Sequence, residues 1–78
     1  MDINNFTEQI REQFLDEDQP KVTPSVKFRE LETWDSLTGM AVLTIIHDEY
    51  DINIPVDDFI SMHTINELFD YVKAKKSE

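Results

Sequence analysis

The chain has 78 residues, no cysteine and a formal net charge of −10. A chain of this length supports one small domain, in which folding buries only about 60% of the unfolded surface, so there is little room for a deep enzyme cleft. The absence of cysteine excludes disulfides and thiolate zinc sites, and any thiol must come from an attached group. We expect a single domain over residues 1–78 that binds or carries and is not an enzyme.

The acidic charge is concentrated in the middle of the chain. Between Glu30 and Val72 there is no Lys or Arg but there are ten acids, whereas the remaining seven acids balance the seven bases. Such a field repels nucleic-acid phosphates and anionic lipid and attracts basic protein surfaces, although it also serves solubility. No signal peptide or apolar run of membrane-spanning length is visible. We expect a cytoplasmic protein with basic protein partners, no nucleic acid and no membrane insertion.

The first helix is predicted from apolar residues at helical spacing, with polar residues on the other face. Asn4 or Asn5 can cap its start, and Glu8 stands three residues after Asn5, as in a capping box. The helix should end near residues 15–18, before Pro20. Its apolar residues are Ile3, Phe6, Ile10 and Phe14.

Residues 19–34 are predicted to form a long connection, because Pro20 and Pro24 forbid a continuous helix. A connection of this length in a small domain is usually functional or well packed. Four apolar residues are available to pin it to the core: Val22, Val26, Phe28 and Leu31.

A second helix should begin at Asp35 and Ser36, because the Asp35 carboxylate is a good acceptor for the N–H groups of the first turn. Residues 40–46 are apolar nearly all round, which indicates packing on more than one side. Gly39 in the second turn costs about 1 kcal/mol relative to alanine. It indicates either a close approach of another group or a tolerated defect.

Two more helices are predicted after this one. A short helix should span about residues 56–60, after a turn that ends at Pro55; a strand over residues 50–54 has no partner strand and is rejected. The last helix starts with a capping box formed by Thr64 and Glu67. Its apolar stripe is Ile65, Leu68, Phe69 and Val72, and cations suited to the helix dipole end it: Lys73, Lys75 and Lys76. The predicted fold is a small all-α bundle of three longer helices plus one short helix, with a long loop after helix one.

The start of the second helix is the candidate site. A serine at the first helical position lies beside unpaired backbone N–H groups, at the positive end of the helix dipole. A phosphodiester attached to Ser36 would therefore occupy a favourable place, and Asp35 beside it could hold a metal ion or a basic residue of a modifying enzyme. Asp-Ser at a helix start is also ordinary capping. His47 and His63 lack metal-ligand spacing, and no metal site is expected.

The wider pattern resembles acyl carrier proteins over nearly the whole chain, without gaps from about residue 35 to 72. The segments that carry the resemblance are Asp35-Ser36-Leu37, Asp48-Glu49-Tyr50, residues 51–55 with the acids Asp57 and Asp58, Thr64-Ile65, Asp70-Tyr71, and Phe28 in the first loop. Together with the length and acidity of the chain, this pattern is more specific than the triplet Asp35-Ser36-Leu37 alone.

The resemblance implies that Ser36 receives 4′-phosphopantetheine from coenzyme A, through a separate phosphopantetheinyl transferase that uses magnesium. Asp35 and Leu37 would flank the arm, and its thiol would carry acyl groups as thioesters between acyl-transferring and acyl-processing enzymes with basic docking surfaces. By matching position, the partner-binding residues would be Asp35, Leu37, Met40, Asp48, Glu49, Asp57 and Asp58. An acyl pocket would be lined by Ile54, Phe59, Met62 and Leu68. Met40 is equally consistent with ordinary core, and for the four pocket residues a role in the core alone is at least as consistent as a pocket.

Some residues depart from the family pattern. Ala41 and His47 make the second helix less acidic than in fatty-acid carriers, and Trp34 replaces a small residue before Asp-Ser-Leu. These departures favour a carrier for a specialised pathway with an amino-acyl, polyketide or unusual acyl cargo, while the overall similarity favours fatty-acid or related acyl metabolism. The rival from another class is an acidic adaptor that carries no arm. We expect a monomer.

Overall fold

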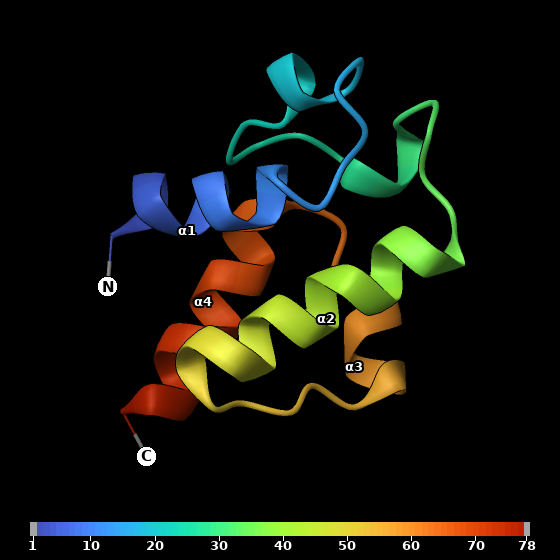
Figure 1. Cartoon of the computed structure of the whole chain (residues 1–78). Coiled ribbons are helices and arrows are strands. Elements are labelled where there is room, and N and C mark those ends of the chain that lie inside the picture. The colour runs from blue at the N-terminus through green and yellow to red at the C-terminus, as the bar shows by residue number, and fades with distance from the viewer. Residues whose placement is uncertain (1, 78) are drawn as a thin grey trace.

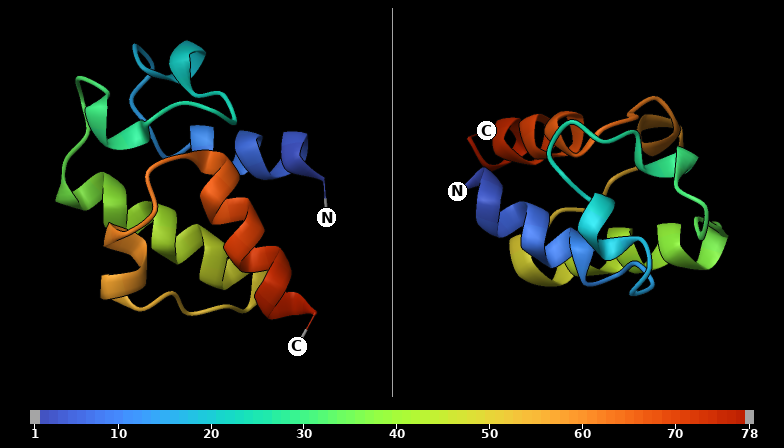
Figure 2. Two further views of the ribbon diagram at one scale, coloured as in Figure 1. Left: turned by 180° about the vertical axis from the view of Figure 1, so that it is seen from behind. Right: turned by 90° about the horizontal axis from the view of Figure 1, so that it is seen from above.

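A computed structural model describes residues 2–77, and over these residues the chain forms four α-helices and no strand. The helices are α1 (Ile3–Arg11), α2 (Ser36–Tyr50), α3 (Val56–Ile60) and α4 (Ile65–Lys76). Figure 1 shows α2 running across the molecule, with α3 near its first half. The start of α1 and the end of α4 lie on the side away from α3 (Figures 1 and 2). The predicted all-α bundle, with one short helix and a long first loop, is confirmed.

The starts of α2 and α4 follow the capping chemistry of the sequence. Asp35 accepts the N–H of Thr38 at 2.8 Å. Thr64 and Glu67 form the complete capping box, since each side chain accepts the other residue's backbone N–H. At its other end, α2 is closed by Asp51, whose φ of 56° is left-handed, a conformation that aspartate adopts more readily than most residues.

The first helix differs from its prediction at both ends. It is capped by Asp2, whose carboxylate accepts the N–H of Asn4 at 3.0 Å. The predicted caps Asn4 and Asn5 both lie inside the helix, and no capping box with Glu8 starts it. It also ends at Arg11, several residues before the predicted 15–18.

The early end of α1 is explained by contacts between Arg11 and the loop that follows the helix. The Arg11 side chain donates to the carbonyl oxygens of Gln19 and Val22, so it holds the returning loop against the helix end. The backbone tightens there, and Phe14 N–H donates to the Arg11 carbonyl at 3.0 Å. This tighter turn still brings Phe14 into the core. Periodicity alone marks Phe14 as a core residue but does not distinguish a helix from a tight turn.

The long loop is well packed, as predicted. It contains two 3₁₀ turns, Gln19–Lys21 and Phe28–Glu30, and Figure 2 shows it folded over the start of α4. The Asn66 N–H donates to the Pro24 carbonyl at 2.8 Å, which fastens the loop to that helix. Of the four predicted anchors, Val22 and Phe28 are fully buried, while Val26 and Leu31 are partly buried against the core.

The end of this loop is held by a buried carboxylate. Asp18 is fully buried, and its Oδ2 accepts both the N–H of Thr33, at 2.8 Å, and the Thr33 hydroxyl. These bonds, the hydroxyl bond first, lower the pKa of Asp18 below 3.8, and Lys21 acts in the same direction. Because Thr33 precedes Trp34 and Asp35, the Asp18–Thr33 contact fixes the approach of the chain to α2.

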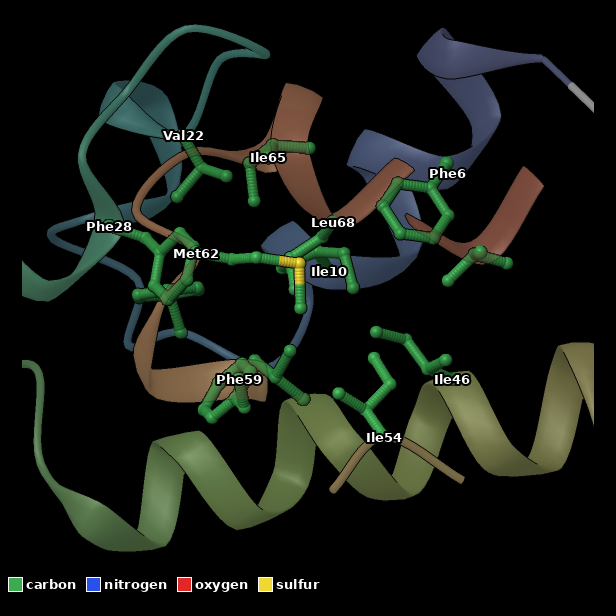
Figure 3. Close-up of a cluster of buried hydrophobic side chains, with 13 residues drawn as sticks. Phe6, Ile10, Val22, Phe28, Ile46, Ile54, Phe59, Met62, Ile65 and Leu68 are labelled. Carbon is green, nitrogen blue, oxygen red and sulfur yellow. The ribbon is translucent and has the colours of Figure 1, made fainter. Parts of the chain in front are cut away.

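All four helices contribute to one apolar core, part of which is drawn in Figure 3. The buried hydrophobic residues are Phe6, Ile10, Phe14, Val22, Phe28, Val42, Ile46, Ile54, Phe59, Met62, Ile65, Leu68 and Val72. Among the described residues, no helix is long and apolar enough to cross a bilayer.

Candidate functional site

Ser36 is the first residue of α2, and its side chain is exposed. Within residues 2–77, no hydrogen bond engages its hydroxyl. Asp35 caps the helix, and Leu37 is 73% exposed. The cap therefore leaves an accessible and unengaged hydroxyl at the positive end of a fifteen-residue helix, where the dipole favours an anionic substituent.

The Asp35 carboxylate is held in its charged form by the helix that it caps. Its Oδ1 accepts the N–H of Thr38 at 2.8 Å and the Thr38 hydroxyl at 3.0 Å. The backbone bond is the main cause that lowers the pKa of Asp35 below 3.8, followed by the hydroxyl bond. Asp35 is exposed, so a negative charge lies next to Ser36 and faces solvent.

A hollow of about 330 Å³ opens beside Ser36, between α2 and α3, and we call it the serine groove. Its walls are mostly apolar, and it is lined by Arg29, Trp34, Ser36, Gly39, Met40, Leu43, Val56, Phe59 and Ile60. A Cβ on Gly39 would lie 3.2 Å from the Trp34 ring and 3.6 Å from that of Phe59. Of the two explanations for this glycine, the close approach of another group is therefore correct.

Of the described residues that line the serine groove, Arg29 alone has a basic side chain. Its guanidinium carbon lies 5.0 Å from the ring centre of Phe28, 5.8 Å from that of Trp34 and 4.8 Å from that of Phe59. It also donates to the carbonyl oxygens of Phe59 and Met62, at the end of α3. Burial lowers the pKa of Arg29, and Glu67 partly offsets this. Arg29 was not predicted as a site residue from the sequence. The signal that could have found it is its position between Phe28 and Trp34, directly before the stretch from Glu30 to Val72 that contains no Lys or Arg.

The predicted partner residues differ in their exposure and in whether they are hydrogen-bonded to another helix. Leu37 and Met40, 73% and 64% exposed, are not core residues. Asp48, Glu49 and Asp57 are exposed as well, but Glu49 accepts a hydrogen bond from Gln9 of α1 at 2.9 Å. Asp58 is half-buried and accepts the Tyr71 hydroxyl at 2.8 Å, so one of its oxygens is committed to α4.

Two exposed apolar residues beside the groove were not predicted. Val56 and Ile60 of α3 are 63% and 60% exposed and line the groove opposite Met40. Their spacing of four residues in a short helix places them on one face, which is the signal that could have found them. With Leu37, they extend the apolar surface around Ser36 from α2 to α3.

The four residues predicted for an acyl pocket are all buried in the core. Phe59 lines the serine groove, whereas Ile54 lines a second hollow of about 310 Å³ with His47 and Asn53. Met62 and Leu68 line neither hollow. An acyl pocket formed by all four together stays a prediction.

Comparisons with known proteins agree with this geometry. The sequence matches the family described as "Phosphopantetheine attachment site" over residues 4–72. It is 30% identical, over 63 residues, to proteins named "Acyl carrier protein" from Rickettsia canadensis (strain McKiel) and Rickettsia rickettsii (strain Iowa). These matches cover 81% of this chain and 73% of each relative. No solved structure gave a significant match. The chain therefore belongs to the acyl carrier protein family, whose members are carrier proteins that hold 4′-phosphopantetheine.

Proposed function

We propose that the chain carries acyl intermediates as thioesters on a 4′-phosphopantetheine arm attached to Ser36, in fatty-acid or related acyl metabolism. The observation that carries the proposal is the accessible Ser36 hydroxyl, at the start of α2 and at the edge of an apolar groove. In this proposal, residues 1–78 act as one monomeric carrier domain.

The residues around Ser36 fit such an arm. A phosphodiester on the Ser36 oxygen meets unpaired N–H groups of the first turn, and the apolar walls of the serine groove suit the uncharged remainder of the arm. The arm supplies a thiol for thioester chemistry, which the cysteine-free chain lacks. Asp35 remains charged beside the serine and is available to a basic residue or metal ion of the modifying enzyme.

The surface around the groove fits partners with basic and apolar patches. Leu37, Met40, Val56 and Ile60 form an exposed apolar set, and acids flank them on both helices. We propose that a phosphopantetheinyl transferase and the acyl-processing enzymes dock here. Asp35, Asp48 and Asp57 would steer the encounter, while Glu49 and Asp58 contribute less freely because each is tied to another helix.

A specialised pathway is the second candidate, and Trp34 favours it. The indole occupies space beneath the groove that a small residue would leave open, and it meets the rings of Phe28 and Phe59 at centroid distances of 5.3 and 6.4 Å. Bulk at this position reduces the room for a long aliphatic chain, which is the cargo of general fatty-acid synthesis. A shorter acyl group fits the remaining space better.

Intact mass spectrometry tests the attachment. The protein is incubated with coenzyme A, magnesium and a transferase of broad specificity, and it should gain the mass of one phosphopantetheine. The Ser36→Ala variant should gain nothing and keep its helical circular dichroism. The matched control is Ser25→Ala, which removes another exposed serine hydroxyl and should load normally.

The same variants separate a carrier from an acidic adaptor. An adaptor would bind its basic partner equally well with Ser36→Ala and would never gain mass under forcing conditions. Loading of the Ser36→Ala variant would also overturn the proposal, because the arm would then be attached elsewhere. Protein isolated from its native host, analysed intact, would identify the cargo and decide between the general and the specialised pathway.

A further inference from the structure

The guanidinium of Arg29 has no ion-pair partner among residues 2–77. It is nevertheless partly withdrawn from water over three aromatic rings. Glu67 influences it electrostatically, but the Glu67 carboxylate is committed to the N–H groups of His63 and Thr64. A partly desolvated charge is costly until it meets a counter-charge.

The contacts of Arg29 leave part of its fork unused. A guanidinium has five N–H donors, and the contacts to Phe59 and Met62 engage one terminal nitrogen each. The backbone contacts hold the group in one orientation, so little freedom is left to lose when a further acceptor binds. Charge-assisted bonds from such a fixed fork are about twice as strong as neutral ones.

Ser36 and Arg29 line the same groove, and Trp34, whose ring lies 5.8 Å from the Arg29 guanidinium carbon, lines it as well. We propose that Arg29 binds an oxyanion that the Ser36 tether brings into the serine groove. This inference rests on the proposed attachment at Ser36. The oxyanion is either the phosphodiester of the arm itself or a carboxylate at the free end of a short acyl cargo, and both present the same chemistry to a guanidinium.

The competing explanation is a purely structural one, in which Arg29 only fastens α3 to the loop. Arg11 provides the comparison, because it makes the same kind of contact without lining the groove. It is partly exposed and donates to the carbonyl oxygens of Gln19 and Val22. Arg11→Gln therefore reproduces the loss of a backbone clamp, whereas Arg29→Gln removes a clamp and the proposed anion site together.

The experiment compares four forms of each protein: without the arm, with the arm, and with the arm bearing a butyryl or a succinyl group. The two acyl groups have the same number of carbons and differ by a terminal carboxylate. The bare arm is attached with coenzyme A and each acylated arm with the corresponding coenzyme A thioester, and every form is checked by intact mass. Thermal midpoints and the phosphorus NMR shift of the arm are measured at low salt for the wild type, Arg29→Gln, Arg29→Lys and Arg11→Gln.

If the phosphodiester is the ligand, attachment of the arm raises the thermal midpoint of the wild type. Arg29→Gln should at least halve that rise and should change the phosphorus NMR shift of the arm. If the cargo carboxylate is the ligand, the succinyl form is more stable than the butyryl form in the wild type, and Arg29→Gln removes this difference. Arg29→Lys should retain part of either effect, because it keeps the charge and loses the fork. Arg11→Gln should retain the whole of it.

Two differences in thermal midpoint decide the inference: that between the forms with and without the arm, and that between the succinyl and butyryl forms. The inference is overturned if both differences are the same in Arg29→Gln and Arg29→Lys as in Arg11→Gln. Failure of the wild type to gain the mass of the arm overturns the attachment at Ser36 and this inference with it. If the wild type gains the mass of the arm but its thermal midpoints and phosphorus signal do not depend on Arg29, the inference is overturned and the attachment at Ser36 stands.

Discussion

The Trp34 indole lies so close to the backbone of Gly39 that a Cβ on this glycine would stand 3.2 Å from ring carbon Cζ2. The indole has little room to retreat, because the rings of Phe14 and Phe28 lie at centroid distances of 6.0 and 5.3 Å. Gly39 therefore lets α2 pass close to Trp34, and both residues line the serine groove.

Replacing Gly39 with alanine should destabilise the protein, although alanine favours a helix by about 1 kcal/mol. The added methyl group forces the indole against its aromatic neighbours, and overpacking of this kind costs about 1–3 kcal/mol. We expect a net loss of about 1 kcal/mol in the free energy of unfolding, measured by urea denaturation. Trp34 is the only tryptophan in the chain, so its fluorescence should also shift.

The Trp34→Ala background provides the control. Without the indole, Gly39→Ala should stabilise the chain by about 1 kcal/mol, as expected from helix propensity alone. The two residues should therefore show a large coupling energy in a double-mutant cycle. An equal effect of Gly39→Ala in both backgrounds would mean that the ring does not limit this position.

Much of this fold can be predicted from local chemistry, and the features that were not predicted depend on residues distant in the sequence. Asp35, Thr64 and Glu67 start their helices as predicted, because a cap needs only residues a few positions apart. The end of α1 at Arg11 could not be predicted, because it depends on loop carbonyls many positions away. For the same reason the sequence left two explanations open for Gly39, since only the folded chain brings Trp34 against it.

In the candidate site, too, some features follow from neighbouring residues and others only from the tertiary structure. Ser36 and its place at a helix start follow from neighbouring residues, and the exposure of Leu37 is consistent with its predicted role. The commitment of Asp58 to Tyr71 depends on the packing of α3 against α4, which no local pattern encodes. Arg29 enters the groove because the loop folds back onto the end of α3, so its position is a property of the tertiary structure.

Leu37 and Leu15 allow a direct test of the docking surface. Both are leucines with large exposed fractions, 73% and 60%, but only Leu37 adjoins Ser36. Leu37→Ser should raise the transferase KM by roughly fivefold, the effect of losing about 1 kcal/mol of apolar contact at an interface, with no change in the thermal midpoint. Steady-state loading kinetics measure this effect. Leu15→Ser should load like the wild type, and equal KM values for the two variants would exclude this docking surface.

Substitutions of Asp35 separate its cap from its charge. Asn is also a good N-cap, so Asp35→Asn should keep the thermal midpoint close to the wild type but slow loading of Ser36, because the negative charge beside the serine is gone. Asp35→Ala should lower both the thermal midpoint and the loading rate. Loading rates are followed by intact mass over time. If Asp35→Asn loads as fast as the wild type, Asp35 contributes only through the cap.

Asp18 should give the protein an acid-sensitive contact between its loop and the start of α2. Its pKa is lowered in the folded state, mainly by the Thr33 hydroxyl and then by the Thr33 N–H, so folding favours the carboxylate form. The stabilisation is fully present above the ordinary value of 3.8 and is lost as the pH falls through the lower folded pKa. Asp35 and Glu67 are shifted in the same direction and add to the loss.

Urea denaturation of the wild type between pH 7 and pH 2 should therefore show a steep decline in stability below about pH 4, set by the reference value of aspartate. Asp18→Asn should be less stable at pH 7, because a neutral amide oxygen forms weaker bonds with the two Thr33 donors than a charged carboxylate oxygen does and the charge contact with Lys21 is lost. Its decline on acidification should be shallower. The matched control is Asp16→Asn, at an exposed acid, which should follow the wild-type curve. An identical acid decline in Asp18→Asn and the wild type would show that the bonds to Thr33 do not couple this loop to proton binding.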